Sequence, residues 1–213
     1  MEDKNNLIRN WVKIGIVTGL LTSLVYPLLI FVELPRLLTV VLAASFGPLL
    51  AIASVGLYQF MQLHKKSVSI QIAVVSNIIA GVILGIMLIV QMALKFPLVD
   101  YLKSSNDNAV QELVSWIWKI DLGLDVTWDV YIVLGTFLFA VCMLRHPRFG
   151  KLIGLTGILI AGVTLAFNVI TFPDPPSESG LLDPGPFVGL WYLAVTIQIM
   201  RSLKWMEDSL GRE

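Results

Sequence analysis

The chain has 213 residues, of which 56% are hydrophobic and only 14% are charged, and its mean hydropathy is +0.81. Soluble domains carry about 25% charged residues, so this composition favours a polytopic membrane protein over a large soluble core. The formal net charge is zero, which leaves no basic excess for nucleic-acid binding. A single cysteine, Cys142, excludes an internal disulfide and a cysteine metal cage.

Six segments are apolar and long enough to cross a bilayer, which takes about 20 residues of helix. They are roughly 14–32, 38–61, 69–94, 124–144, 152–172 and 187–204. The first follows MEDKNNLIRNWVK and lacks a small-residue cleavage site, so we interpret it as a retained span. We therefore expect an all-α, single-domain bundle of six membrane helices.

The basic residues predict the orientation of this bundle. When the segments are numbered alternately, most Lys and Arg residues fall on the side of the two termini, including those of the turns at 64–67 and 145–151. The positive-inside rule then places both termini in the cytoplasm and the acidic loop 173–186 outside. The absence of a leader rich in Arg and Ser favours the plasma membrane of a prokaryotic cell. His64 and His146 lie in the basic turns, where we expect them to be solvated.

The connector 95–120 has helical character of its own. The stretch 107–118 has an apolar face and two tryptophans, and it predicts either a short helix lying in the membrane interface or the aqueous start of the fourth helix. Small residues at four-residue spacing indicate close helix packing inside one chain. These pairs are Gly15/Gly19, Gly81/Gly85, Gly150/Gly154 and Gly185/Gly189.

Three aspartates, Asp121, Asp125 and Asp129, lead into the fourth apolar segment at four-residue spacing. On a helix this spacing places them on one face, about 6 Å apart along the axis. Counting about 20 residues back from Arg145 puts Asp125 near the outer boundary and Asp129 one turn deeper. A charged Asp in mid-membrane costs about 2.5–3.5 kcal/mol, so we expect this face to point into the bundle or into a water-filled cavity.

Other polar side chains fall at a similar depth. Tyr26 and Glu33 belong to the outer half of the first segment. Gln91 and Asn168 lie near the outer ends of the third and fifth segments. If these side chains converge on the aspartates, the outer half of the bundle contains a polar pocket beneath the loop 173–186.

The pocket interpretation predicts a membrane protein that binds or transports a cation or small cationic solute. Asp125, Asp129 and Asn168 would line the site, Asp121 would guide the solute inward, and Asp129 would be the binding or proton-coupled group. The structural alternative is that Asp129 is protonated or hydrogen-bonded and holds helices together. A further alternative is a non-catalytic subunit or sensor that works through a homo-oligomer or a membrane partner.

An enzyme remains an alternative, in which the three aspartates hold Mg²⁺ against a lipid-linked phosphate. Their spacing resembles the repeated-Asp part of G-x-x-x-D-x-x-x-D, a motif of six-helix enzymes that transfer phosphatidyl groups. The D-G-x-x-A-R element that precedes it in those enzymes is absent here and position 117 is Ile rather than Gly, so the sequence assigns no family. No histidine lies inside a predicted span, which disfavours zinc hydrolases and serine proteases. The balance favours a protein that is not an enzyme and needs no cofactor.

Overall fold

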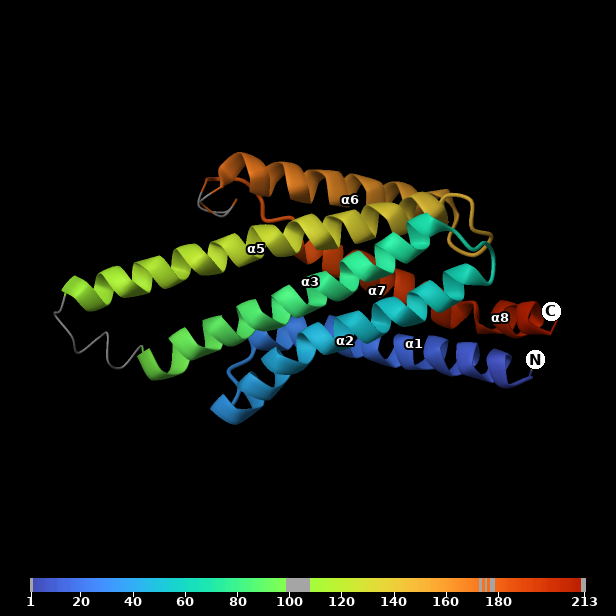
Figure 1. Cartoon of the computed structure of the whole chain (residues 1–213), viewed down its shortest axis with the longest axis horizontal. Coiled ribbons are helices and arrows are strands. Elements are labelled where there is room, and N and C mark those ends of the chain that lie inside the picture. Colours follow the sequence, from blue (N-terminus) through green and yellow to red (C-terminus); the bar gives the residue numbers. More distant parts are fainter. Residues whose placement is uncertain (1, 99–107, 173, 175, 177–178, 212–213) are drawn as a thin grey trace.

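The computed structural model describes residues 2–98, 108–172, 174, 176 and 179–211, which form helices joined by short turns, with no β-strand among them. The elements are α1 (Glu2–Phe31), α2 (Arg36–Gln62), α3 (Val68–Ala93), the π-helical turn η1 (Leu94–Leu98), α5 (Asn108–Met143), α6 (Gly150–Thr171), α7 (Gly185–Arg201) and α8 (Leu203–Leu210). Successive long helices pack side by side from α1 to α6, and α7 packs against both α1 and α6. Both ends of the chain lie at the same end of the bundle (Figure 1).

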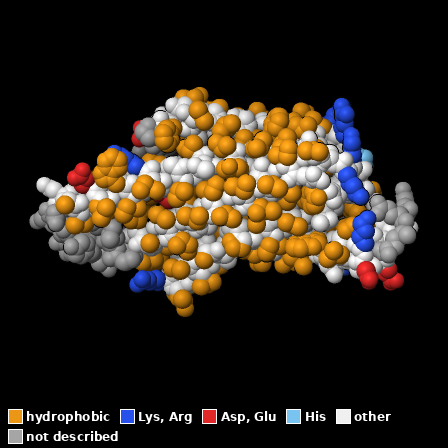
Figure 2. Space-filling model, in the orientation of Figure 1, with side chains coloured by type: hydrophobic (Ala, Val, Ile, Leu, Met, Phe, Trp, Pro, Cys, Tyr) orange, Lys and Arg blue, Asp and Glu red, His pale blue; other side chains and the backbone are white. Residues whose placement is uncertain are grey.

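Within the described residues, five helices, α1, α2, α3, α5 and α6, are long and apolar enough to cross a membrane. The pair α7 and α8, which meet at a bend of 56°, makes a sixth candidate if the two are counted as one span. In the most apolar stretch of each of the five, only 28–44% of the residues are buried inside the bundle. The remaining apolar side chains face outward and form a belt across the middle of the face in Figure 2. The predicted all-α membrane bundle is therefore confirmed.

Helix α5 is continuous over 36 residues, about 54 Å at 1.5 Å per residue, and so exceeds the ~30 Å hydrocarbon layer. The stretch predicted as an interfacial helix at 107–118 forms the first turns of α5 from Asn108 onward, while residue 107 lies outside the described residues. Of the two arrangements that the sequence leaves open, the structure has the continuous helix. The reason is local, because no proline or glycine occurs between Asn108 and Leu122 to end it.

Glycines allow the helix backbones to approach closely within the chain. A Cβ on Gly15 of α1 would lie 2.5 Å from the Cα of Gly56 in α2, and a Cβ on Gly81 of α3 would lie 2.7 Å from the carbonyl oxygen of Gly47. Such contacts tolerate no side chain, which agrees with the packing predicted from the small-residue pairs. The spacing alone was not sufficient evidence, because Gly85, Gly150 and Gly189 have open space where a Cβ would stand.

A buried polar network joins four helices at the centre of the bundle. The side-chain amide of Asn77 in α3 donates to Ser54 Oγ of α2 at 3.1 Å and to the Tyr192 hydroxyl of α7 at 2.7 Å. Thr136 of α5 donates to the same hydroxyl at 3.0 Å. Asn77 and Thr136 have no exposed surface, and these bonds pair the Asn77 amide nitrogen and the hydroxyls away from water, while Asn77 Oδ1 has no hydrogen-bond partner among the described residues.

His146 corrects the expectation that both histidines are solvated, because it is only 2% exposed. Its ring packs among those of Phe60, Phe149 and Trp205, with centroids 5.0–5.6 Å away, and Nδ1 accepts a hydrogen bond from the backbone of Arg148. His64 is exposed, but its ring packs edge-on against the ring of His146, with the two centroids 5.1 Å apart. Burial, with the neighbouring charges of His64 and Arg148, lowers the pKa of His146 to about 3.

The depressed pKa of His146 predicts a pH-dependent stability. The unfolded chain binds a proton at this side chain below pH 6.5 whereas the folded chain does not, so stability is complete above that value and falls as the pH drops toward 3. We expect the free energy of unfolding to fall by about 2 kcal/mol between pH 7 and pH 5. His146→Phe should flatten this slope, whereas the exposed-site control His64→Gln should keep most of it. Equal slopes in wild type and His146→Phe, measured by denaturant unfolding in detergent, would contradict this assignment.

Candidate functional site

Helix α5 turns its aspartates into the bundle. Asp121 and Asp129 are 4% and 2% exposed, and Asp125 between them is half-buried. Thr127 and Leu134, on the opposite side of the helix, are exposed. The acidic face therefore points away from the lipid, as expected from the cost of a carboxylate in hydrocarbon.

Asp121 is paired across the bundle with a residue that the sequence also singled out. The amide nitrogen of Gln91 in α3 donates to Asp121 Oδ2 at 2.9 Å. The second carboxyl oxygen, Oδ1, is buried and has no hydrogen-bond partner among the described residues. This contact joins α3 to α5 at the end of the bundle opposite the termini (Figure 1) and leaves one acceptor position open.

Asp129 lies deeper and has a more apolar environment. Its Oδ2 is buried with no hydrogen-bond partner in the described part of the chain, and so is Nε1 of the adjacent Trp128. Ile132 and Val133, one turn further along, belong to an apolar cluster against which Trp128 also packs. A charged carboxylate in such a place is stable only beside a counter-charge or with a proton. Asp129 is thus a buried acid with one carboxyl oxygen that accepts no hydrogen bond from the described residues.

Sequence reasoning missed Asp183, which lies in the acidic loop 173–186 just before α7. Its Oδ1 accepts a hydrogen bond from Gly185 N at 2.9 Å, at the start of that helix. The charge of Asp183 also acts on Asp125, Asp129 and Tyr26. The signal that would have found it is the Asp-Pro-Gly sequence at 183–185, since an aspartate side chain often accepts a hydrogen bond from the backbone two residues further on. The acidic group is therefore built by α5 and this loop together.

The structure does not gather all of the predicted site residues. Tyr26 is near enough to be influenced by Asp125 and Asp183, while its ring also packs against Phe46 at 6.1 Å. Asn168 is buried, but its amide donates to the Thr164 carbonyl of its own helix at 3.1 Å.

Glu33 is exposed in the turn between α1 and α2. No hydrogen bond or ion pair between described residues links Asn168 or Glu33 to an aspartate of α5. The structure therefore places Asp183 within electrostatic range of Asp125 and Asp129, and Tyr26 within range of Asp125 and Asp183. Gln91 is hydrogen-bonded to Asp121.

The arrangement of the acids bears on what they could hold. Within the described ranges, no group of three or more His, Cys, Asp or Glu side chains is close enough to hold a metal ion. Asp121, Asp125 and Asp129 are spread along the helix, so each presents its own oxygens instead of converging on one point. Two cavities among the described residues lie elsewhere, one at the end that carries the termini and one on the outer surface between α2 and α3. The α5 carboxylates are therefore arranged as separate groups along the helix.

Comparison with known proteins adds no relative from which a role could be transferred. No family model, no curated protein and no solved structure matches the chain.

Proposed function

We propose that this protein binds a small monovalent cation or an amine-bearing cationic solute through the acidic face of α5, and that it moves the solute along that face. The chain is a helical membrane bundle, and the acidic residues lie where one of its long helices approaches the end opposite the termini. Asp183 and Asp125 would form the entrance, and Asp129 would form the inner binding position.

One observation carries this proposal. Asp129 is 2% exposed, lies beside apolar residues and has a carboxyl oxygen without a partner in the described part of the chain. Buried polar groups usually have hydrogen-bond partners, so the open oxygen of Asp129 is a position where a bound ligand could donate. An unsatisfied buried acceptor favours a ligand that supplies the missing donor or charge.

A monovalent or organic cation suits the site better than a divalent metal. Divalent ions such as Mg²⁺ and Ca²⁺ require six or more oxygen ligands around one point. The α5 carboxylates do not form such a group. A cation with one charge is neutralised by one carboxylate, and an ammonium group also donates hydrogen bonds to the open oxygens.

The same chemistry predicts a link to protons. A proton and a cation compete for the open oxygen of Asp129, so acidification should weaken cation binding. If the basic turns face the cytoplasm, as the positive-inside rule predicts, then Asp183 and Asp125 face the exterior. Exchange of a cation for a proton at Asp129 would then couple solute movement to the proton gradient.

The direct test is ligand-dependent thermal unfolding of the purified protein in detergent. Na⁺, K⁺, NH₄⁺, methylammonium and tetramethylammonium are compared at constant ionic strength, above and below neutral pH. A ligand at 100 times its dissociation constant should stabilise the folded state by about 2.7 kcal/mol. We expect at least one cation to raise Tm in the wild type, with a smaller effect at acidic pH.

The controls use carboxylates that are matched in charge but placed differently. Asp129→Asn and Asp125→Asn should abolish the cation-dependent shift, whereas Asp174→Asn, an exposed acid in the same outer loop, should retain it. A cation shift that persists in both α5 variants would disprove the assignment. If no cation raises Tm in the wild type but Mg²⁺ does, the enzyme alternative becomes the better interpretation.

A further inference from the structure

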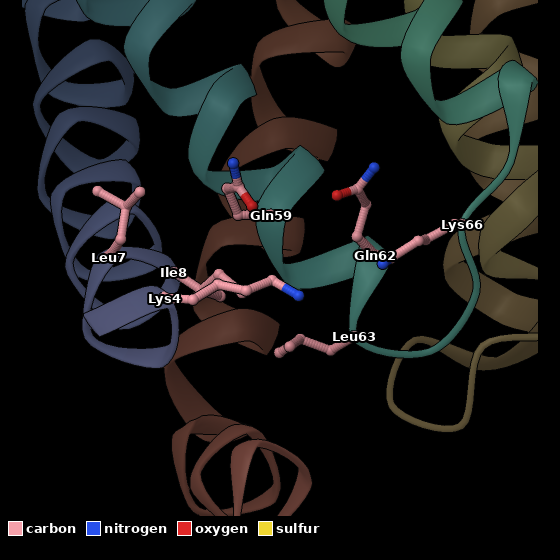
Figure 3. A pocket seen from close by; sticks show the side chains of 7 residues that line it. All are labelled: Lys4, Leu7, Ile8, Gln59, Gln62, Leu63 and Lys66. Atoms are coloured by element: carbon pink, nitrogen blue, oxygen red, sulfur yellow. The ribbon is translucent and has the colours of Figure 1, made fainter. Parts of the chain in front are cut away.

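A cavity of about 220 Å³ opens at the basic end of the bundle, far from the acidic face of α5. It lies between the first turns of α1 and the last turns of α2 with the turn that follows. Its lining includes Lys4, Leu7, Gln59, Gln62, Leu63 and Lys66. Figure 3 shows the lysines entering from opposite sides, Lys4 from α1 and Lys66 from the turn after α2.

The lining has two chemical halves. Two ammonium groups and the Gln59 amide supply hydrogen-bond donors, and Leu7, Ile8 and Leu63 supply an apolar wall. The Gln62 amide also borders the cavity and donates to the Tyr58 hydroxyl at 2.6 Å. Leu7 is 58% exposed on α1, a helix that is a candidate membrane span. The cavity thus combines a polar centre with an apolar edge that continues onto the outer surface of the bundle.

The positive charge of this cavity is not neutralised within the described part of the chain. Lys4 and Lys66 are exposed and take part in no ion pair there. Arg9, about one turn further along α1, is by contrast paired with Glu207 of α8 at 2.7 Å. Asn5 also donates to the Leu210 carbonyl at 2.9 Å, so α8 fixes the start of α1 in place. The two lysines are held near each other by the fold and still need a counter-charge.

We propose that this cavity binds the phosphate group of an anionic phospholipid from the adjacent leaflet. The ammonium groups of Lys4 and Lys66 bind the phosphate oxygens, and the amides of Gln59 and Gln62 line the space around it. The acyl chains run along Leu7 and the neighbouring apolar surface of α1. Lysines near an anionic membrane surface each contribute about 1 kcal/mol, or roughly fivefold in affinity. The bound lipid would link the start of α1 to the turn between α2 and α3.

The test measures lipid binding to the whole protein by native mass spectrometry, with phosphatidylglycerol and phosphatidylcholine titrated separately. We expect the wild type to bind phosphatidylglycerol more tightly than phosphatidylcholine. The double variant Lys4→Gln/Lys66→Gln should bind phosphatidylglycerol about 25-fold more weakly, at about fivefold for each lysine. Circular dichroism checks that the variant keeps its helical content.

A matched double variant, Lys65→Gln/Lys151→Gln, removes the same charge from exposed positions outside the cavity lining and should bind as the wild type does. Equal weakening in both double variants would mean general attraction to the basic surface and would overturn the proposal. Glycerol 3-phosphate serves as a headgroup without chains. If it displaces phosphatidylglycerol at comparable concentration, the site recognises a free phosphate compound and the lipid assignment is wrong.

Discussion

Replacing Asp129 by leucine is expected to stabilise the bundle while abolishing cation binding. The side chain is buried beside an apolar cluster, and Oδ2 has no partner among the described residues. Leaving a polar group unpaired in such a place costs about 1–3 kcal/mol, which an apolar side chain of similar size recovers. We therefore expect Asp129→Leu to raise the free energy of unfolding by that amount and to weaken cation affinity at least ~100-fold, the equivalent of about 2.7 kcal/mol.

The matched control lies two turns away on the same helix face. Asp121 accepts a hydrogen bond from Gln91, so Asp121→Leu breaks a bond between α3 and α5. We expect it to lower the free energy of unfolding by about 0.5–1.5 kcal/mol, the reverse of the change at Asp129. Both variants are measured by denaturant unfolding in the same detergent. If Asp129→Leu is as destabilising as Asp121→Leu and cation binding persists, Asp129 has the structural role of holding helices together.

The second large effect is expected at the crossing of α3 and α5. A Cβ on Gly135 would overlap Oδ1 of Asn77 and would lie 2.8 Å from its Cγ, with the Ala73 carbonyl oxygen at 3.1 Å. The backbone of α3 prevents any easy movement, and Asn77 is fixed by its bonds to Ser54 and Tyr192. Gly135→Ala should therefore lower the free energy of unfolding by about 2–4 kcal/mol, through overpacking and broken buried hydrogen bonds.

Another glycine of α5 provides the control for this prediction. Gly123 has open space where its Cβ would stand, so Gly123→Ala should be neutral or stabilising by up to about 1 kcal/mol through helix propensity. Combining Gly135→Ala with Asn77→Ala removes the asparagine side chain that would clash with the new Cβ at position 135. The double variant should lose less stability than the sum of the single variants. If the two losses of unfolding free energy are additive, Asn77 is not the group that clashes with the Cβ at position 135.

The sequence by itself determined the class of the molecule and the positions of its apolar spans, whereas α1 and α5 extend well beyond the predicted segments 14–32 and 124–144. Long apolar stretches in a chain with few charged residues can satisfy their backbone groups in lipid only as helices, so the spans follow from composition. The polar turns at 64–67 and 145–151 interrupt the apolar stretches, so the helix ends there also follow from the sequence. The inward orientation of Asp121 and Asp129 also followed from the sequence, because a carboxylate facing hydrocarbon is costly.

Only the tertiary structure decided which side chains meet. Asn168 bonds to its own helix and Asp183 joins the acidic face from a loop, because helix rotation and loop path depend on packing between distant segments. His146 is buried although it lies in a basic turn, since Phe60 of α2 and Trp205 of α8 pack against it together with Phe149 of the same turn. Gly15 requires a glycine and Gly85 does not, although both belong to the same sequence pattern. A repeating pattern along one helix specifies which residues share a face. Which helix packs against that face depends on contacts between segments that are far apart in the sequence.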